Sequence, residues 1–129
     1  MSLKTVRATR EGLFGAKTAI GLIISPGAIF VALPSTRALW RIVRVVCKDR
    51  VVLAPVLDVG PWNEHDEAYV FGDARPAAEC GVDTRGRTTN HAGIDLSDGV
   101  LTALGIVDFR PGQWEVAWEF VDPMPSANG

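Results

Sequence analysis

Apolar and polar positions alternate most regularly in residues 113–121. Every second residue there is apolar, and these fall on one face of an extended chain: Trp114, Val116, Trp118 and Phe120. Glu115 and Glu119 fall on the opposite face. A period of two predicts a strand with one face in a core and the other toward solvent.

Two runs rich in β-branched residues, 39–47 and 50–58, flank the pair Lys48-Asp49. Runs of this length on either side of a two-residue turn predict a β-hairpin. Pro55 lies within the second run. Because proline lacks an amide hydrogen, we expect a sheet edge or an irregular ladder at that point.

Residues 97–105 carry the signals of one short helix. Ser97 is a preferred N-cap residue, and Asp98 places a negative charge in the first turn. Gly105 suits the left-handed conformation that often ends a helix. Together they predict a helix over residues 98–104.

Residues 59–94 differ in character from the rest of the chain. They are rich in Gly, Pro, Asp, Asn, Arg and His and show few periodic apolar positions. We expect one helical turn within them, near Ala77-Ala78-Glu79. Long loops in compact domains tend to carry function. We therefore expect one long inserted loop that contributes to a site.

Strands dominate these expectations, since runs 4–10 and 28–33 add further strands and only one helix is indicated. The 13 glycines and 8 prolines of the 129-residue chain favour many turns. Closing the sheet would remove its exposed edges. We predict a mainly β fold, a small closed barrel, in one domain that spans residues 1–129 with its core at about 8–121.

Composition excludes several classes of protein. Apolar residues make up 47% and charged residues 22%, a balance that argues against disorder. With a net charge of −2, the chain lacks the excess of basic residues that is typical of nucleic-acid-binding proteins, so we expect no nucleic-acid partner. The apolar stretch 19–34 is interrupted by Ser-Pro-Gly at 25–27 and is too short for a membrane span.

Cofactor and metal signals are weak. The chain has no GxGxxG, P-loop or GxSxG motif, and we expect no cofactor. Six residues have side chains of the types that bind metal ions: His65, Asp66, Glu67, Asp73, Asp83 and His91. Their spacing is not a recognised ligand pattern, so we expect no metal.

The two cysteines, Cys47 and Cys80, leave two readings open. They form one disulfide if the protein is exported, or they are two buried, unpaired apolar residues. Met1-Ser2-Leu3 resembles a remnant of an expression vector. If a native signal has been removed, we expect the cell envelope or periplasm as the location.

Four segments in this order resemble the double-psi β-barrel of the rare lipoprotein A family, which is related to expansins, barwins and some endoglucanases. They are GAKTAIG (15–21), WRIVRV (40–45), LDVGPW (57–62) and IDLS (94–97) with the helix that follows. The resemblance covers about residues 8–121. It implies a six-stranded double-psi barrel that acts on cell-wall glycans, in some members as a lytic transglycosylase.

The chain departs from that family in two places. Residues 63–93 separate the third and fourth motifs, where the family has a short link. Leu22 stands where active members tend to carry a glutamate, and leucine cannot donate a proton. The second departure weakens the expectation of transglycosylase activity.

Asp58 and Asp95 are the candidate acids, with His91 as a candidate base beside either of them. Both aspartates end apolar segments at loops. Cleavage of a glycosidic bond needs a positioned proton donor, and a lytic transglycosylase can use a single carboxyl because a sugar hydroxyl attacks. Burial against Pro61 or Trp62 would raise the pKa of Asp58. Alternatively, each aspartate only accepts backbone hydrogen bonds within its turn.

Seven residues are candidates for substrate binding: Thr18, Trp62, Asn63, Tyr69, Arg85, Arg87 and Asn90. The aromatic rings offer flat faces to sugars, whereas Trp40 is expected in the core. The loop 85–91 could bind hydroxyls or a carboxylate such as that of a stem peptide or a muramyl lactyl group. Alternatively, it is a solvated loop whose His91 orders Asp95.

Three functions remain open at this point. The first is lytic-transglycosylase-like cleavage of peptidoglycan, with glycan strands of the cell wall as partner. The second is a non-catalytic carbohydrate-binding module. The third is a structural barrel.

Overall fold

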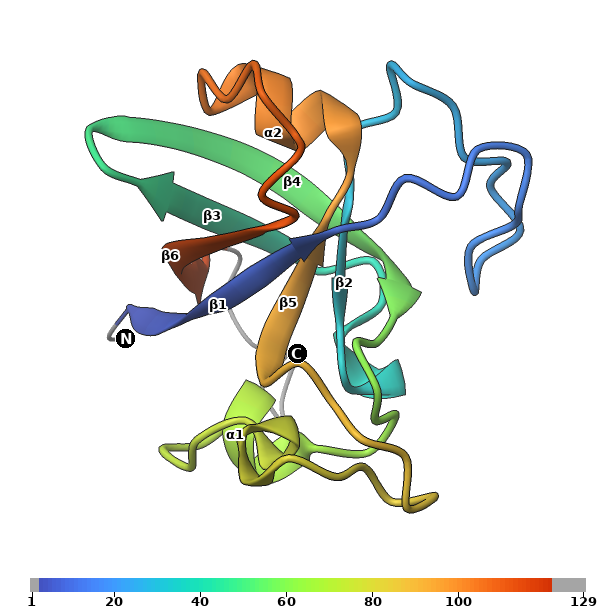
Figure 1. Ribbon diagram of the computed structural model, residues 1–129, viewed down its shortest axis with the longest axis vertical. Coiled ribbons are helices and arrows are strands. Elements are labelled where there is room, and N and C mark those ends of the chain that lie inside the picture. The colour runs from blue at the N-terminus through green and yellow to red at the C-terminus, as the bar shows by residue number, and fades with distance from the viewer. Residues whose placement is uncertain (1–2, 122–129) are drawn as a thin grey trace, which may run out of the picture.

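Six strands form a closed barrel in the computed structural model, which describes residues 3–121 (Figure 1). The strands are β1 (Lys4–Arg10), β2 (Val31–Leu33), β3 (Ile42–Cys47), β4 (Arg50–Val59), β5 (Ala92–Leu96) and β6 (Gln113–Phe120). Their order is β1-β5-β2-β4-β3-β6, with β6 pairing back to β1. Two pairs, β1–β5 and β2–β4, are parallel. The prediction of a mainly β, six-stranded barrel is confirmed.

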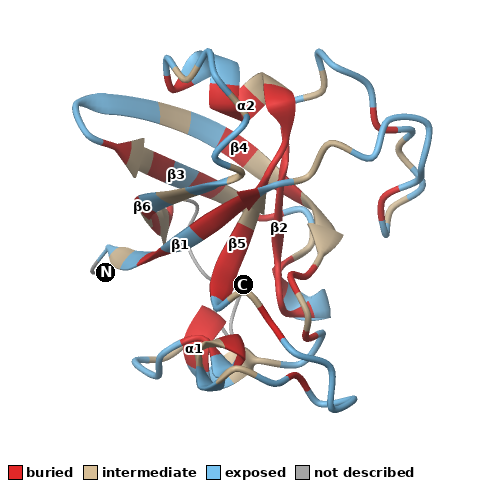
Figure 2. Ribbon diagram, in the orientation of Figure 1, coloured by how far each residue is buried: buried red, intermediate tan, exposed pale blue. Residues whose placement is uncertain are grey.

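Alternation along the strands builds the core. Val116, Trp118 and Phe120 of β6 point inward and are buried, as their spacing predicts. Figure 2 shows buried residues along β5 and β2 as well. Pro55 lies where β4 changes partner, since β3 pairs with residues 50–55 and β2 with residues from Val56 onward.

The predicted helix is α2 (Asp98–Ala103), at one end of the barrel (Figure 1). Ser97 Oγ accepts hydrogen bonds from Val100 N at 3.3 Å and from Phe30 N at 3.0 Å. Gly105 has a φ of 80°. The N-cap and the terminating glycine are therefore as predicted.

The long insertion between β4 and β5 covers the other end of the barrel (Figure 1). It contains α1 (Glu67–Val70) and the 3₁₀ turn η2 (Ala77–Cys80), and the latter confirms the expected helical turn. Tyr69 and Val70 of α1 are fully buried in the barrel core. The insertion is thus part of the core as well as a loop.

The predicted core position of Trp40 is wrong. β3 begins two residues later, after the 3₁₀ turn η1 (Thr36–Ala38), and Trp40 has a φ of 71°. Its amide donates to Val56 O at 2.8 Å, and its side chain is 67% exposed. The left-handed backbone at the strand entrance turns the ring to solvent instead of continuing the alternation.

Cys47 and Cys80 are both unpaired, so no disulfide links them. Cys47 is buried, as one reading expects, but Cys80 is exposed. Within residues 3–121, no helix has the length and apolar character needed to cross a bilayer.

Candidate functional site

Asp58 and Asp95 lie in one row across four neighbouring strands. Backbone pairing sets Asp58 of β4 opposite Ala32 of β2, and Ala32 opposite Asp95 of β5. Asp95 in turn lies opposite Thr9 of β1. Residues in register on adjacent strands point to the same face, so these four side chains share one face of the barrel wall.

A break in strand register turns Asp58 to this face. Val31 pairs with Val56 and Ala32 pairs with Asp58, so the β2–β4 ladder skips Leu57. Without the extra residue Asp58 would point the same way as Val56, which is fully buried in the core. Bulges occur often beside active sites, where they redirect a side chain.

The small side chain of Ala32 separates the two aspartates. Its neighbours in β2, Val31 and Leu33, point into the core, so Ala32 points to the opposite face of the strand, where it is fully covered. Adjacent strands lie about 4.8 Å apart, which puts the Cα atoms of Asp58 and Asp95 about 10 Å apart. Carboxyl groups that extend from such positions can act on one glycosidic bond.

Asp58 is held by backbone amides. Its Oδ1 accepts from Ala19 N at 2.8 Å and from Val59 N at 2.9 Å. The turn-forming role that the sequence left open for Asp58 is therefore present, and the same contacts fasten the loop between β1 and β2 beside the row. The two amide donors fix the orientation of the Asp58 carboxyl.

Asp95 is held by Thr9, whose hydroxyl donates to Asp95 Oδ1. Burial raises the pKa of Asp95 to about 7, the Thr9 hydrogen bond opposes this rise, and the charge of Asp58 adds to it. Asp95 is thus the aspartate that can carry a proton near neutral pH.

Glu11 is a third carboxyl of the row, and sequence reasoning missed it. Its amide donates to Leu96 O at 2.9 Å, which extends the β1–β5 pairing and puts Glu11 on the same side of the chain as Thr9. The pKa of Glu11 is raised to about 9, mainly by burial. The charges of Asp58 and Asp95 and a hydrogen bond to Asp58 add to this rise. Its place two residues after Thr9 was the available signal, but it depends on a pairing across more than eighty residues.

A pocket of about 370 Å³ begins at Val59 and Gly60, directly after Asp58. Gly60 has a φ of 141°, and a Cβ placed on it would lie 3.7 Å from Asp95 Oδ2. The Gly60 backbone therefore joins the pocket to the carboxyl row. A side chain here would be strained by the positive φ, and its Cβ would be in van der Waals contact with Asp95.

Trp62 forms part of the pocket wall. Its Nε1 donates to Asn90 Oδ1 at 2.8 Å, and the Arg87 guanidinium lies 5.7 Å from its ring centroid. Asp83 holds Arg87 through a 2.6 Å ion pair. The ring is half-buried, so part of it still faces solvent.

The predicted binding residues divide into three groups. Four of them line the Trp62 pocket: Trp62, Asn63, Arg85 and Arg87. Asn90 and Thr18 form internal hydrogen bonds. Asn90 Oδ1 accepts from Trp62 Nε1, and the hydroxyl of the buried Thr18 accepts from Leu22 N at 3.2 Å. Tyr69 does not face a ligand, because its side chain fills the barrel core and has no exposed surface.

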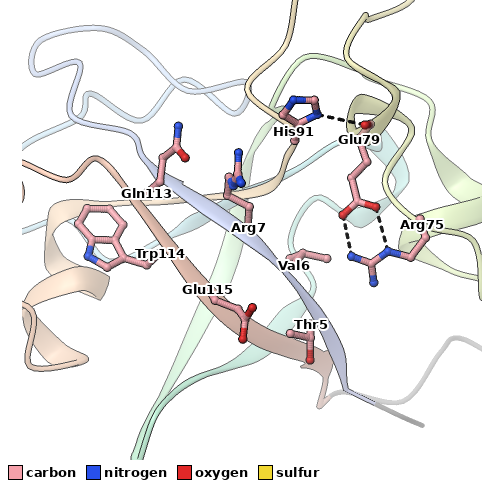
Figure 3. A pocket seen from close by; sticks show the side chains of 9 residues that line it. All are labelled: Thr5, Val6, Arg7, Arg75, Glu79, His91, Gln113, Trp114 and Glu115. Atoms are coloured by element: carbon pink, nitrogen blue, oxygen red, sulfur yellow. Dashed lines mark hydrogen bonds and ion pairs between the residues drawn. The ribbon is translucent and has the colours of Figure 1, made fainter.

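His91 lies away from the aspartates, so its predicted pairing with them is wrong. It precedes β5 and lies four positions before Asp95, about 13 Å along an extended chain. Its Nδ1 is 3.0 Å from Glu79 O. Figure 3 shows it in a different pocket, of about 640 Å³, beside Arg7 and the Arg75–Glu79 ion pair.

Metal binding has no geometric support in the described part of the chain. No group of three or more His, Cys, Asp or Glu side chains in residues 3–121 is placed to hold an ion.

Comparison with protein families gives one match. Residues 2–116 match the model of a family described as a domain of unknown function, DUF8814. The chain belongs to the DUF8814 family. Comparison of this DUF8814 chain with curated proteins finds no match.

Solved structures similar to the DUF8814 chain share its barrel. The expansin of Clavibacter michiganensis in complex with cellohexaose has a TM-score of 0.54 at 18% identity, over 97% of this chain and 54% of that one. The same expansin without ligand gives 0.54 at 18%, over 97% and 53%. The DUF8814 chain thus spans about half the length of the expansin chains.

A Streptomyces papain inhibitor has a TM-score of 0.57 at 17% identity, over 94% of the DUF8814 chain and 96% of its own. At these identities the likeness shows a shared fold. The closed six-stranded barrel fits the predicted double-psi fold, while membership of the rare lipoprotein A family stays a prediction.

Proposed function

We propose that this protein binds glycan strands of the bacterial cell wall in the Trp62 pocket and cleaves them at the adjoining carboxyl row. The observation that carries the proposal is the pair of Asp58 and Asp95 on one face of the barrel wall, next to Gly60, which lines that pocket. An expansin of the same fold holds cellohexaose, a β-linked glycan, in its crystal structure. A protein acting on such strands would lie in the cell envelope or periplasm.

The pocket offers groups suited to a sugar chain. The half-buried Trp62 ring presents a flat apolar face, and aromatic faces bind sugar rings with little loss of conformational freedom. Arg85 is exposed in the pocket wall. A guanidinium there would favour glycans that carry carboxylates, as the muramyl units of peptidoglycan do.

The carboxyl row offers acid–base chemistry. Asp95, with its pKa raised to about 7, would donate its proton to the glycosidic oxygen as the C1–O bond breaks. Asp58, held by two amides, would stabilise the positive charge that develops on the sugar. The C6 hydroxyl of the same sugar would then attack C1 and return its proton to Asp95. This lytic-transglycosylase-like step consumes no water and leaves a 1,6-anhydro end.

Binding and cleavage are tested separately on purified peptidoglycan, with cellohexaose as a neutral comparison. Mass spectrometry of released fragments should show anhydro ends with the wild-type chain and none with Asp95→Asn. Trp62→Ala should abolish sedimentation with insoluble glycan, whereas Trp62→Phe, which keeps a flat ring, should retain most of it.

Two outcomes would contradict the proposal in different ways. Binding without release of any fragment would exclude cleavage and leave a carbohydrate-binding barrel. Absence of binding to every glycan would leave a barrel with only a structural role.

A further inference from the structure

The pocket of about 640 Å³ takes no part in the proposed reaction, although it borders the carboxyl row. Its walls come from β1, β6 and the insertion (Figure 3), and we call it the Arg7 pocket. Arg7 lies two residues before Thr9 on the same face of β1, a distance of about 7 Å along a strand. Gln113, which pairs with Thr9 across the β1–β6 ladder, also lines the pocket. The pocket therefore begins beside the hydroxyl that holds Asp95.

Arg7 and Glu115 bring opposite charges to this pocket and do not neutralise each other. They lie directly opposite each other on β1 and β6. Residues in such positions of an antiparallel ladder have Cα atoms about 5 Å apart, which is close enough for their side chains to pair. No ion pair joins them, however, and among residues 3–121 no hydrogen bond or ion pair reaches the Glu115 carboxylate.

Arg44 and Glu119 show how the same arrangement behaves elsewhere in the barrel. They too lie directly opposite each other, on β3 and β6, and their side chains meet at 3.3 Å. Arg7 instead donates from Nη1 to Asn90 O at 2.8 Å, in the segment of the insertion that leads into β5. Figure 3 shows its side chain turned away from Glu115. The insertion thus holds the Arg7–Glu115 pair open.

The other charged groups of the pocket are matched within it. Arg75 donates two hydrogen bonds to the Glu79 carboxylate, at 2.9 and 2.6 Å. His91 Nδ1 lies 3.0 Å from Glu79 O, and because a carbonyl oxygen only accepts, Nδ1 is the donor. The pocket therefore presents one unmatched cation and one unmatched anion, Arg7 and Glu115. Such a pair is complementary to a ligand that carries both a carboxylate and an ammonium group.

We propose that the Arg7 pocket binds the stem peptide of peptidoglycan, with a carboxylate of the peptide on Arg7 and an ammonium group on Glu115. This assignment rests on the proposed function, which brings a glycan strand to the neighbouring Asp95. An α-amino-acid centre carries both charged groups on one carbon, so a single residue of the peptide can bridge the two side chains. The half-buried ring of Trp114 offers an apolar wall to the rest of the peptide.

The test uses the free tripeptide L-Ala-γ-D-Glu-meso-diaminopimelate, which contains no sugar, with the full chain. NMR titration follows the indole N–H signals of the tryptophans and gives the Kd. The tripeptide should shift the signal of Trp114, which lines the Arg7 pocket, and leave that of Trp62 unchanged. A fully acetylated tripeptide, without ammonium groups, and a fully amidated one, without carboxylates, should both bind more weakly.

Variants assign each charge of the peptide to one side chain. Arg7→Gln and Glu115→Gln should each weaken binding of the tripeptide by about tenfold, the equivalent of one charge-assisted hydrogen bond. Glu115→Gln should bind the acetylated tripeptide as well as the wild type does, and Arg7→Gln the amidated one, because the lost partner is already missing. Arg44→Gln and Glu119→Gln are the matched controls outside the pocket and should leave the Kd unchanged.

Unchanged affinity in Glu115→Gln would overturn the proposal. This variant decides the matter even if loss of the contact with Asn90 disturbs the fold of Arg7→Gln, because the Glu115 carboxylate has no contact to lose. A shift of the Trp62 signal in place of the Trp114 signal would also overturn it, and equal affinity for a tripeptide of L-alanine would overturn the assignment to the stem peptide. If the tripeptide binds as expected but glycan strands are neither bound nor cleaved, the proposed function fails and the peptide site stands.

Discussion

Tyr69 Oη accepts a 2.7 Å hydrogen bond from Trp118 Nε1 in the centre of the barrel. The same hydroxyl donates to Gly93 O at 2.9 Å, and the two rings meet edge to face at 5.9 Å. A residue of the insertion is thereby fixed to β5 and β6. The insertion that forms the Trp62 pocket consequently has its position set by the core.

Tyr69→Phe should lower the free energy of unfolding by about 1–3 kcal/mol, because Trp118 Nε1 and Gly93 O would both be left buried without a partner. Urea unfolding followed by tryptophan fluorescence measures this change. A loss below about 0.5 kcal/mol, as is typical of surface substitutions, would mean that the hydroxyl does not fasten the insertion.

The carboxyl row should make stability fall as pH rises. Glu11 and Asp95 have ordinary pKa values of 4.5 and 3.8, which folding raises to about 9 and about 7. The folded chain thus keeps protons that the unfolded chain has released, and its stability decreases from about pH 4 to pH 9. One pKa unit corresponds to about 1.4 kcal/mol, so the total loss is on the order of several kcal/mol.

Between pH 7 and 9 most of the fall belongs to Glu11, because Asp95, with a pKa of about 7, is already half ionised at the start of this interval while Glu11, with a pKa of about 9, is still protonated. Urea unfolding at both pH values should therefore show a smaller decrease for Glu11→Gln than for the wild type. If the two proteins lose the same free energy over this interval, the raised pKa of Glu11 is refuted.

Local sequence patterns predicted much of the barrel, because several of its elements are determined by residues that are close together in the sequence. Period-two alternation located β6, the two-residue turn located the β3–β4 hairpin, and Ser97 with Gly105 bounded α2. Asp58 and Asp95 could be chosen because each ends an apolar run. Each of these signals lies within about ten residues of chain, where propensity and periodicity apply.

The remaining features depend on contacts between distant segments. Glu11 joins the row only because β1 pairs with β5 in parallel, and Asp58 shares a face with Asp95 only because the ladder skips Leu57. Tyr69 was taken for a surface platform because its own segment lacks periodicity, yet Trp118 and Gly93 draw it inward. No window of sequence contains these pairings.

Ala32 should tolerate no larger side chain. It has no exposed surface and lies between Asp58 and Asp95, so the two additional methyl groups of Ala32→Val would have to displace the row. Overpacking of this kind costs about 1–3 kcal/mol. Ala117→Val is the matched control, since Ala117 is a half-exposed residue of β6 where valine suits a strand. Equal unfolding midpoints for the two variants would show that the space between the carboxyls is not filled.

Asp83 should determine glycan binding through Arg87. Its Oδ1 accepts from the amides of Arg85 and Arg87 at 2.9 and 2.8 Å, and its Oδ2 pairs with the Arg87 guanidinium that lies over Trp62. Burial by itself would raise the pKa of Asp83, but the hydrogen bonds from Arg87 and Arg85 and the charge of Arg87 together lower it below its usual value. Asp83 therefore stays ionised down to a lower pH than an ordinary aspartate. The turn that it forms with residues 85–87 should persist until the pH falls through this lowered pKa.

Asp83→Asn should release Arg87 and weaken binding to peptidoglycan by about tenfold, the equivalent of one charge-assisted hydrogen bond. Asp108→Asn provides the control, because Asp108 accepts from the amide and guanidinium of Arg110 in the same way but lies between α2 and β6. Sedimentation with insoluble glycan compares the two variants. Equal weakening in both would trace the effect to lost surface charge, whereas a loss confined to Asp83→Asn would trace it to the support of the Trp62 ring.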